Sequence, residues 1–269
     1  MRYEIRELGL GGILDQAVKL TKNHFGLFLG IVGVLLIPYN VIVGFIQLSI
    51  APKLSPNPMV QDPAVTQAIL QNMVILMPLA LLGAYVIIPL TNAALVHAIA
   101  SEYLERSAGV LDSLKWALRR ILPLFATWFL VLLAIFGGFI LCIVPGILAA
   151  FWFGLATQVV IIEGTWGFAA LKRSKELMTG NIGTLFVLGL LIFFINAGLL
   201  LGGNLIPQPH VQVVISSLVQ GVATIFESAA VVVFYFSCRC RHEQFDLTRL
   251  AQSVGIESPA EIQPDSAQS

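Results

Sequence analysis

A stripe of polar side chains interrupts the last apolar stretch of the sequence. Ser216, Gln220, Thr224 and Glu227 follow one another at helical spacing, whereas most residues between them are apolar. An ionised carboxylate in a membrane costs several kcal/mol, so such a residue usually faces water or a polar partner. The stripe is therefore expected to point into a helix bundle, where Glu227 would be its chemically active member.

The sequence offers several partners for Glu227 at similar depth. We expect Asn92 and Thr91 to face it, followed by His97 and Asn196. Two interpretations of this intramembrane polar site stay open. The residues could line a proton-binding or solute-binding cavity, or a protonated carboxyl group could hold helices together by hydrogen bonds.

No catalytic or metal-binding pattern accompanies this stripe. The chain has no P-loop, no Gly-x-Ser-x-Gly, no His-Glu-x-x-His and no EF-hand loop. The histidines and cysteines fall on separate segments and suggest neither a metal site nor a disulfide framework; they are His24, His97, His210, His242, Cys142, Cys238 and Cys240. We therefore expect no cofactor and no enzymatic activity.

The composition requires a membrane. Hydrophobic residues make up 57% of the 269, charged residues 11%, and the mean hydropathy is +0.88. Soluble domains carry roughly 25% charged residues. The net charge of zero excludes a nucleic-acid partner, which would need a basic face.

Six apolar stretches have the length that a membrane-spanning helix needs, which is about 20 residues. They cover residues 25–48, 73–99, 121–142, 145–163, 183–203 and 212–237. Pro145 separates the third from the fourth, because proline starts a helix more easily than it continues one. The sequence predicts an all-α polytopic membrane helix bundle, with six transmembrane helices arranged as three hairpins. Residues 1–250 form one transmembrane domain, a helix begins at Pro63, and residues 251–269 form a disordered cytoplasmic tail.

The basic residues orient this bundle. With the N-terminus inside, every Lys and Arg except Lys53 lies on the inner side. Because basic residues concentrate in cytoplasmic segments, we expect a multi-pass protein of the cell (inner) membrane with both termini in the cytoplasm.

A short amphipathic basic segment precedes each predicted hairpin, at residues 14–22, 111–120 and 170–178. At the inner membrane surface, such helices would contact anionic lipid headgroups at about 1 kcal/mol per cation. The candidate headgroup contacts are Lys19, Lys22, Lys115, Arg119, Arg120, Lys172 and Arg173. Two alternatives stay open: the cations only set the topology, or the segments dock another membrane or cytoplasmic protein.

Two stretches resemble a known family. One contains Ile143-Val144-Pro145-Gly146 and continues through residues 159–164 and 169–177 to Gly180-Asn181; the other is residues 235–247. Together they are similar to the glycerophosphoryl diester phosphodiesterase membrane-domain family and its YciC-like relatives. The relatives usually carry an acidic or small residue where this chain has Cys238.

The resemblance implies a prokaryotic polytopic protein, and many members of that family have no assigned function. The phosphodiesterase activity in the family belongs to a separate soluble barrel, fused in some members, so an enzymatic role does not carry over. We expect a non-enzymatic accessory or scaffold protein linked to membrane lipids. The alternative is a small-solute or proton-coupled transporter that uses the stripe around Glu227. A polar cavity that reaches Glu227 would favour transport, whereas a dry, packed centre would favour a scaffold.

Overall fold

The computed structural model describes residues 8–50, 63–103, 108–203 and 205–253, and within these ranges the chain forms helices and no strands. The elements are α1 (Leu10–Asn23), α2 (Phe25–Ile50), α3 (Pro63–Leu82), the π-helix η1 (Gly83–Ile87), α4 (Ile88–Tyr103), α5 (Val110–Arg119), α6 (Ile121–Leu141), α7 (Ile143–Trp152), α8 (Ala156–Ile162), α9 (Phe168–Met178), α10 (Ile182–Gly203) and α11 (Pro209–Ser253).

Six helical segments in the described ranges are long and apolar enough to cross a membrane. They are Phe25–Ile50, Asn72–Tyr103, Ile121–Leu141, Ile143–Ile162, Ile182–Gly203 and Pro209–His242. The predicted all-α polytopic bundle is thus confirmed, and the protein is an integral membrane protein. The second and sixth segments extend past the predicted ends, to Tyr103 and His242, because helix continues after the apolar run has ended.

Three units follow one another along the chain, and each consists of a short helix and a hairpin. Helix α1 precedes the α2 and α3–η1–α4 hairpin, α5 precedes α6 and α7–α8, and α9 precedes α10 and α11. The short helices all begin directly after a glycine, namely Gly9, Gly109 and Gly167. At Gly167, φ is +65°, a conformation that side chains disfavour. The structure therefore confirms three hairpins, each with a preceding amphipathic helix.

Prolines shape the spans. Pro145 lies in the first turn of α7, directly after the sharp break at Cys142, as the sequence predicts. Pro89 follows the wide π-turn, in which the Ile88 amide donates to the Gly83 carbonyl five residues earlier. Since proline has no N–H and clashes with the preceding turn, a wider turn before Pro89 relieves that conflict. Tyr39 of α2 donates to the Leu79 carbonyl at 2.8 Å beside this turn.

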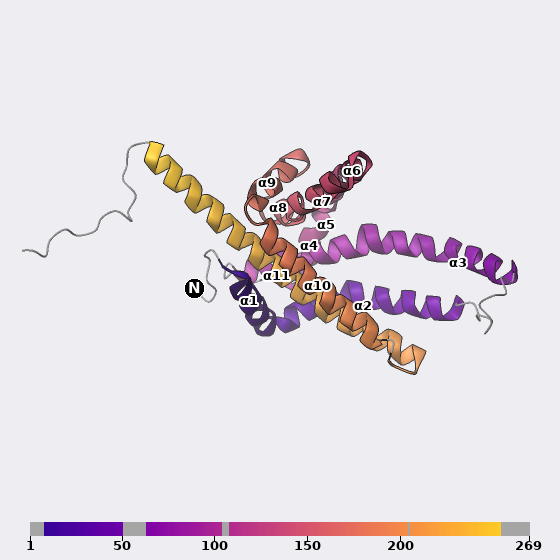
Figure 1. Cartoon of the computed structure of the whole chain (residues 1–269). Coiled ribbons are helices and arrows are strands. Elements are labelled where there is room, and N and C mark those ends of the chain that lie inside the picture. The colour runs from indigo at the N-terminus through magenta and orange to yellow at the C-terminus, as the bar shows by residue number, and fades with distance from the viewer. Residues whose placement is uncertain (1–7, 51–62, 104–107, 204, 254–269) are drawn as a thin grey trace, which may run out of the picture.

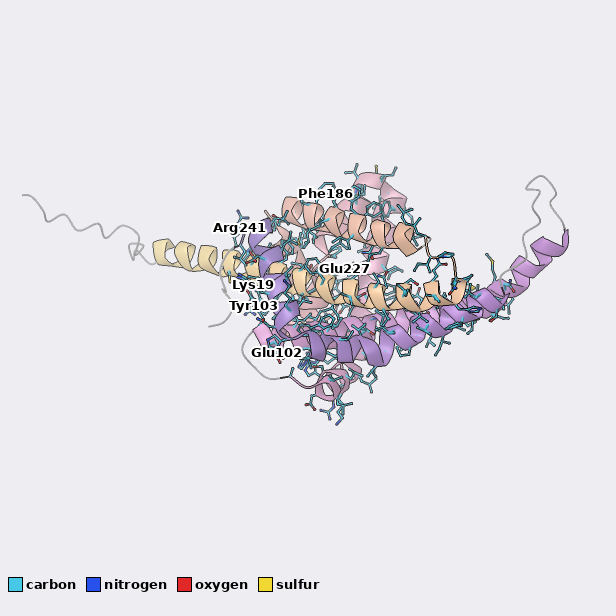
Figure 2. All side chains as sticks on the ribbon, turned by 90° about the horizontal axis from the view of Figure 1, so that it is seen from below. Lys19, Glu102, Tyr103, Phe186, Glu227 and Arg241 are labelled. Carbon is cyan, nitrogen blue, oxygen red and sulfur yellow. The ribbon has the colours of Figure 1, made fainter. Side chains whose placement is uncertain are left out.

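Different helices lie at the two ends of the bundle. Helix α1 and the C-terminal part of α11 lie at one end, whereas the C-terminal end of α2 and the N-terminal end of α3 lie at the other (Figure 1). We call the first the basic end, because Lys19 and Arg241 lie there, together with Glu102 and Tyr103 (Figure 2). At this end the core closes around fully buried side chains of α2, α4 and α11, which include Phe28, Leu95, Ile99, Phe234 and Tyr235.

The outer surfaces of the spans are apolar. On α10 only Leu188 is buried, and large apolar side chains such as Phe186 and Phe193 point outward. Such exposure would be unfavourable in water, but it suits a surface that faces lipid.

Helix α11 is longer than the sequence predicts. It continues to Ser253, three residues into the segment predicted as a disordered tail. Residues 254–269, the remainder of that predicted tail, lie outside the described residues, as do residues 51–62 between α2 and α3.

Candidate functional site

Glu227 takes part in a hydrogen-bond chain between α10 and α11. The Asn196 side-chain amide donates to Glu227 Oε1, and Gln220 Nε2 donates to Asn196 Oδ1 at 3.1 Å. Asn196 Nδ2 also donates to its own helix, at the Ile192 carbonyl. Glu227 lies well along α11 from the basic end (Figure 2). Three of the six predicted polar residues therefore form one connected group.

The other predicted polar residues lie outside this chain. Thr224 donates to the Gln220 carbonyl and Ser216 to the Val213 carbonyl, so both hydroxyls bond within α11. Asn92 is half-buried and has no hydrogen bond to the stripe among the described residues. Thr91 donates to the Ile87 carbonyl of its own helix segment. Glu227 therefore bonds the carboxamide of Asn196 on α10. It does not bond Asn92 or Thr91 of the second span, which were predicted because they lie at a similar depth in the membrane.

A cavity of about 770 Å³ opens between α2, α10 and α11 and reaches one end of this chain. Its polar lining consists of carboxamides and hydroxyls, contributed by Asn40, Gln47, Gln212, Ser216, Ser217 and Gln220. Glu227 does not line it. Seven residues, or about 10 Å of helix, separate Gln220 from Glu227. Toward the basic end, Phe234 and Tyr235 are fully buried, so the cavity does not continue through the bundle there.

At the basic end, each short helix is fastened to a span by a buried polar side chain. The Tyr103 hydroxyl donates to Gln16 Oε1 of α1 at 2.8 Å. Ser113 of α5 lies 3.4 Å from His97 Nδ1 of α4. Ser174 of α9 donates to the Trp152 carbonyl at 2.8 Å. Because buried polar groups are costly without partners, these contacts fix the position of all three helices.

Glu163 connects three elements at this end. Arg173 of α9 donates through Nε to both carboxylate oxygens, at 3.1 and 3.2 Å. The Tyr235 hydroxyl of α11 donates to Glu163 Oε1 at 2.7 Å. The Arg173 side chain is only 26% exposed. Arg173 was predicted as a headgroup contact, and the structure instead places it in an internal ion pair.

Five of the six remaining predicted headgroup cations lie at the surface. Lys19 pairs with Asp15 at 2.7 Å on the exposed side of α1. The side chains of Lys22, Lys115, Arg119 and Lys172 are exposed. Lys175, which was not a candidate, lies over the Trp152 ring at 4.3 Å. The exposed cations therefore sit on helices whose opposite faces are held against the spans.

Arg120 occupies a different environment. It is half-buried, and its guanidinium carbon lies 5.0 Å from the Trp116 ring centroid. A cavity of about 270 Å³ opens beside it, and His97, Ser101, Trp116, Glu163 and Gly164 are among the lining residues. His97 stacks on Trp116 with ring centroids 4.4 Å apart. This is a concave polar site at the level of the exposed cations.

Acidic residues at the ends of the spans were missed by the sequence reasoning. Glu102 at the end of α4 pairs with His24 at 3.1 Å, and Glu163 follows α8 directly. Each is the first acidic residue after a long apolar run, and that position is a usable signal. Within the described residues, no group of three or more His, Cys, Asp or Glu side chains could hold a metal ion.

No family model, no curated protein and no solved structure matches this chain. The class of protein is therefore defined by its fold alone, as a polytopic membrane protein with six candidate spans in the described residues.

Proposed function

We propose that the protein is a non-enzymatic accessory or scaffold protein of the inner membrane that associates with membrane lipids. Its basic end would face the cytoplasm, with both termini on that side. The proposal rests chiefly on one observation: α1, α5 and α9 are each fastened to a span by a buried polar contact, while Lys22, Lys115, Arg119 and Lys172 stay exposed.

This arrangement supports lipid association for an electrostatic reason. The cytoplasmic leaflet carries anionic lipids, and each nearby cation contributes about 1 kcal/mol of attraction. Cations on a flexible loop would lose conformational entropy on contact with lipid, whereas helices held against the spans have already lost most of that freedom. The core next to these helices is filled with buried side chains, which supports a scaffold role more than the transport of a solute through the basic end.

The test compares the protein in nanodiscs of phosphatidylcholine with nanodiscs that also contain phosphatidylglycerol. The wild type should melt at a higher temperature in the anionic nanodiscs. A variant with Lys22, Lys115, Arg119 and Lys172 replaced by Gln should lose most of that difference. Lys53→Gln, which removes the one cation assigned to the other side, is the control and should keep it. Equal lipid dependence in all three proteins would contradict the proposal.

A second candidate function is proton-coupled or small-solute transport through the site around Glu227. The observation that favours it is the 770 Å³ polar cavity, which ends at Gln220 and is linked to Glu227 through Asn196. Proteoliposomes with an internal pH-sensitive dye provide the test. Transport predicts faster proton uptake with the wild type than with Glu227→Gln, and equal rates for both proteins and for empty liposomes would remove this candidate.

We also propose kinship with the glycerophosphoryl diester phosphodiesterase membrane-domain family. Residues 143–181 and 235–247 support it, since the first stretch contains the start of α7, with Pro145 in its first turn, and the α9–α10 junction. An experimental structure of a member of that family would test the proposal. It should show a short helix before each of three hairpins, and a different order of elements would contradict the kinship.

A further inference from the structure

The residues that join each short helix to its span form a repeated pattern at the basic end. His24, between α1 and α2, pairs with Glu102 at the end of the second span of its unit. Asn181, between α9 and α10, accepts a hydrogen bond from Arg241 of α11 at 2.9 Å. In both units, the junction residue thus bonds the second span of the same unit.

The second unit departs from this pattern. Its junction residue is Arg120, and its second span is followed by Glu163, the expected partner. Glu163 instead accepts hydrogen bonds from Arg173 and Tyr235. Arg120 lies next to Gly164, where a Cβ atom would come within 2.9 Å of Arg120 Nη1. Among the described residues, Arg120 forms no ion pair, so its charge is compensated by no carboxylate there.

Arg120 can therefore bind an anion in this cavity, although Glu163 also lines it. Arg173 neutralises Glu163, which leaves the guanidinium of Arg120 as the unmatched charge in the lining. A planar guanidinium binds phosphate oxygens through parallel hydrogen bonds, and such bonds are stronger in a half-buried site than in water. His97, Ser101 and Trp116 add further polar groups around the cavity. A phosphate group fits this chemistry.

An apolar groove begins at the next residue in the chain. It has a volume of about 540 Å³, and only apolar atoms are exposed along its lining. Residues from η1 and α6 line it: Tyr85, Val86, Ile121, Leu122, Phe125, Ala126 and Phe129. The Tyr85 and Phe125 rings, with centroids 6.0 Å apart, connect its two walls. Leu122 and Phe129 are exposed, so the groove opens toward the lipid-facing surface.

The distance between the polar cavity and the apolar groove matches the distance between the headgroup and the acyl-chain region of a phospholipid. His97 and Val86 line the polar cavity and the groove and lie 11 residues apart, about 16 Å along the helix. One leaflet of the hydrocarbon core is about 15 Å thick. A phosphate at Arg120 would therefore place an acyl chain along the groove.

We propose that this junction of α4, α5 and α6 is a binding site for one anionic phospholipid. Its phosphate binds Arg120 beside Trp116, and one acyl chain lies in the groove lined by Phe125 and Ala126. The site deepens the proposed lipid association by naming the lipid class and its place, and it rests on that function. It differs from the surface cations in holding a single lipid, which should survive detergent purification.

The experiment measures phospholipid retained by the purified protein, using native mass spectrometry of the detergent-solubilised chain. The wild type should retain a phospholipid. Arg120→Gln should lower retention about tenfold or more, the effect of losing a charge-assisted hydrogen bond. Ala126→Phe, which fills the groove, should lower it similarly. Lys175→Gln removes a positive charge elsewhere at the basic end, Ala134→Phe adds the same bulk elsewhere on α6, and both should retain lipid within about twofold of the wild type.

The possible outcomes distinguish a bound phospholipid from bound free phosphate. They also distinguish this site from lipid association in general. Displacement of the lipid by added inorganic phosphate, or a loss with Arg120→Gln but not with Ala126→Phe, would show a phosphate site without an acyl chain and overturn the inference. Equal retention by all variants would also overturn it. A thermal melt of each variant establishes that it is folded. The surface-cation experiment uses other residues, so lipid association in general can stand while this site fails.

Discussion

Asn196 and Glu227, which are 31 positions apart in the sequence, are hydrogen-bonded across α10 and α11. This contact joins the hairpin whose first span, α10, has Leu188 as its single buried residue. The polar chain is therefore a principal specific contact between α10 and the rest of the described bundle.

Replacing Glu227 separates a hydrogen-bonding role from a charge-dependent one. Glu227→Gln keeps an oxygen that can accept from Asn196, so the free energy of unfolding should change by less than about 1 kcal/mol. Glu227→Leu removes the acceptor and should cost about 1–2 kcal/mol. Thermal unfolding in nanodiscs measures both. A large loss of stability with Gln and none with Leu would contradict the hydrogen-bonding role.

The bond from Tyr103 to Gln16 should fix α1 against the bundle. Tyr103→Phe keeps the ring, which stacks on Phe236 at 5.0 Å, and removes only the hydroxyl. We expect a loss of about 1 kcal/mol, because Gln16 is buried and loses this hydrogen bond.

A double-mutant cycle checks this interpretation. Gln16→Met in the Tyr103→Phe background should cost less than it does alone, because neither polar partner is then left unsatisfied. Strictly additive losses would mean that the two side chains do not stabilise one another.

Removing the carboxylate of Glu163 should destabilise the basic end. Glu163→Gln removes the carboxylate to which Arg173 and Tyr235 both donate in a half-buried site, and it should cost about 1–2 kcal/mol, less than for a fully buried pair. The same change makes the cavity beside Arg120 more positive, so retention of anionic phospholipid should stay at the wild-type level or rise. Thermal unfolding and native mass spectrometry on the same preparation test both. Loss of the lipid from a folded Glu163→Gln protein would contradict the assignment of Arg120 as the anion-binding group.

A side chain at position 164 should destabilise the protein. Its φ is +75°, and an added Cβ would lie 2.9 Å from Arg120 Nη1. Gly164→Ala should cost about 1 kcal/mol and displace the guanidinium. Gly189→Ala on α10, where a Cβ meets nothing within 4 Å, is the matched control and should be neutral or stabilising. Equal effects of the two substitutions on unfolding temperature would show that Gly164 is not a restrained position.

Much of the fold follows from the sequence because lipid imposes a simple requirement. A helix that crosses the membrane must be long and apolar, so the six spans are visible as runs of apolar residues. Pro145 marks the α6–α7 turn for an equally local reason. The π-turn before Pro89 was not predicted. Beside it, Tyr39 of α2 donates to the Leu79 carbonyl, a contact that depends on the packing of α2 against this turn.

The site was less predictable because it depends on which helices are neighbours. Helical spacing correctly places Gln220 and Glu227 on one face, but spacing on α11 cannot tell whether that face meets Asn92 or Asn196. Likewise, Arg120 and Arg173 are equivalent as basic residues near span ends. Only the three-dimensional arrangement shows that Arg173 reaches Glu163 while Arg120 does not.

The central claim is that the basic end of this bundle faces the cytoplasmic, anionic leaflet, and cysteine labelling tests it most directly. In a background with Cys142, Cys238 and Cys240 replaced by Ser, single cysteines are introduced as Gln208→Cys and Lys115→Cys, both at exposed positions. Intact cells are then treated with a membrane-impermeant maleimide. The account predicts labelling of Gln208→Cys in intact cells and of Lys115→Cys only after permeabilisation, and the reverse pattern would contradict it.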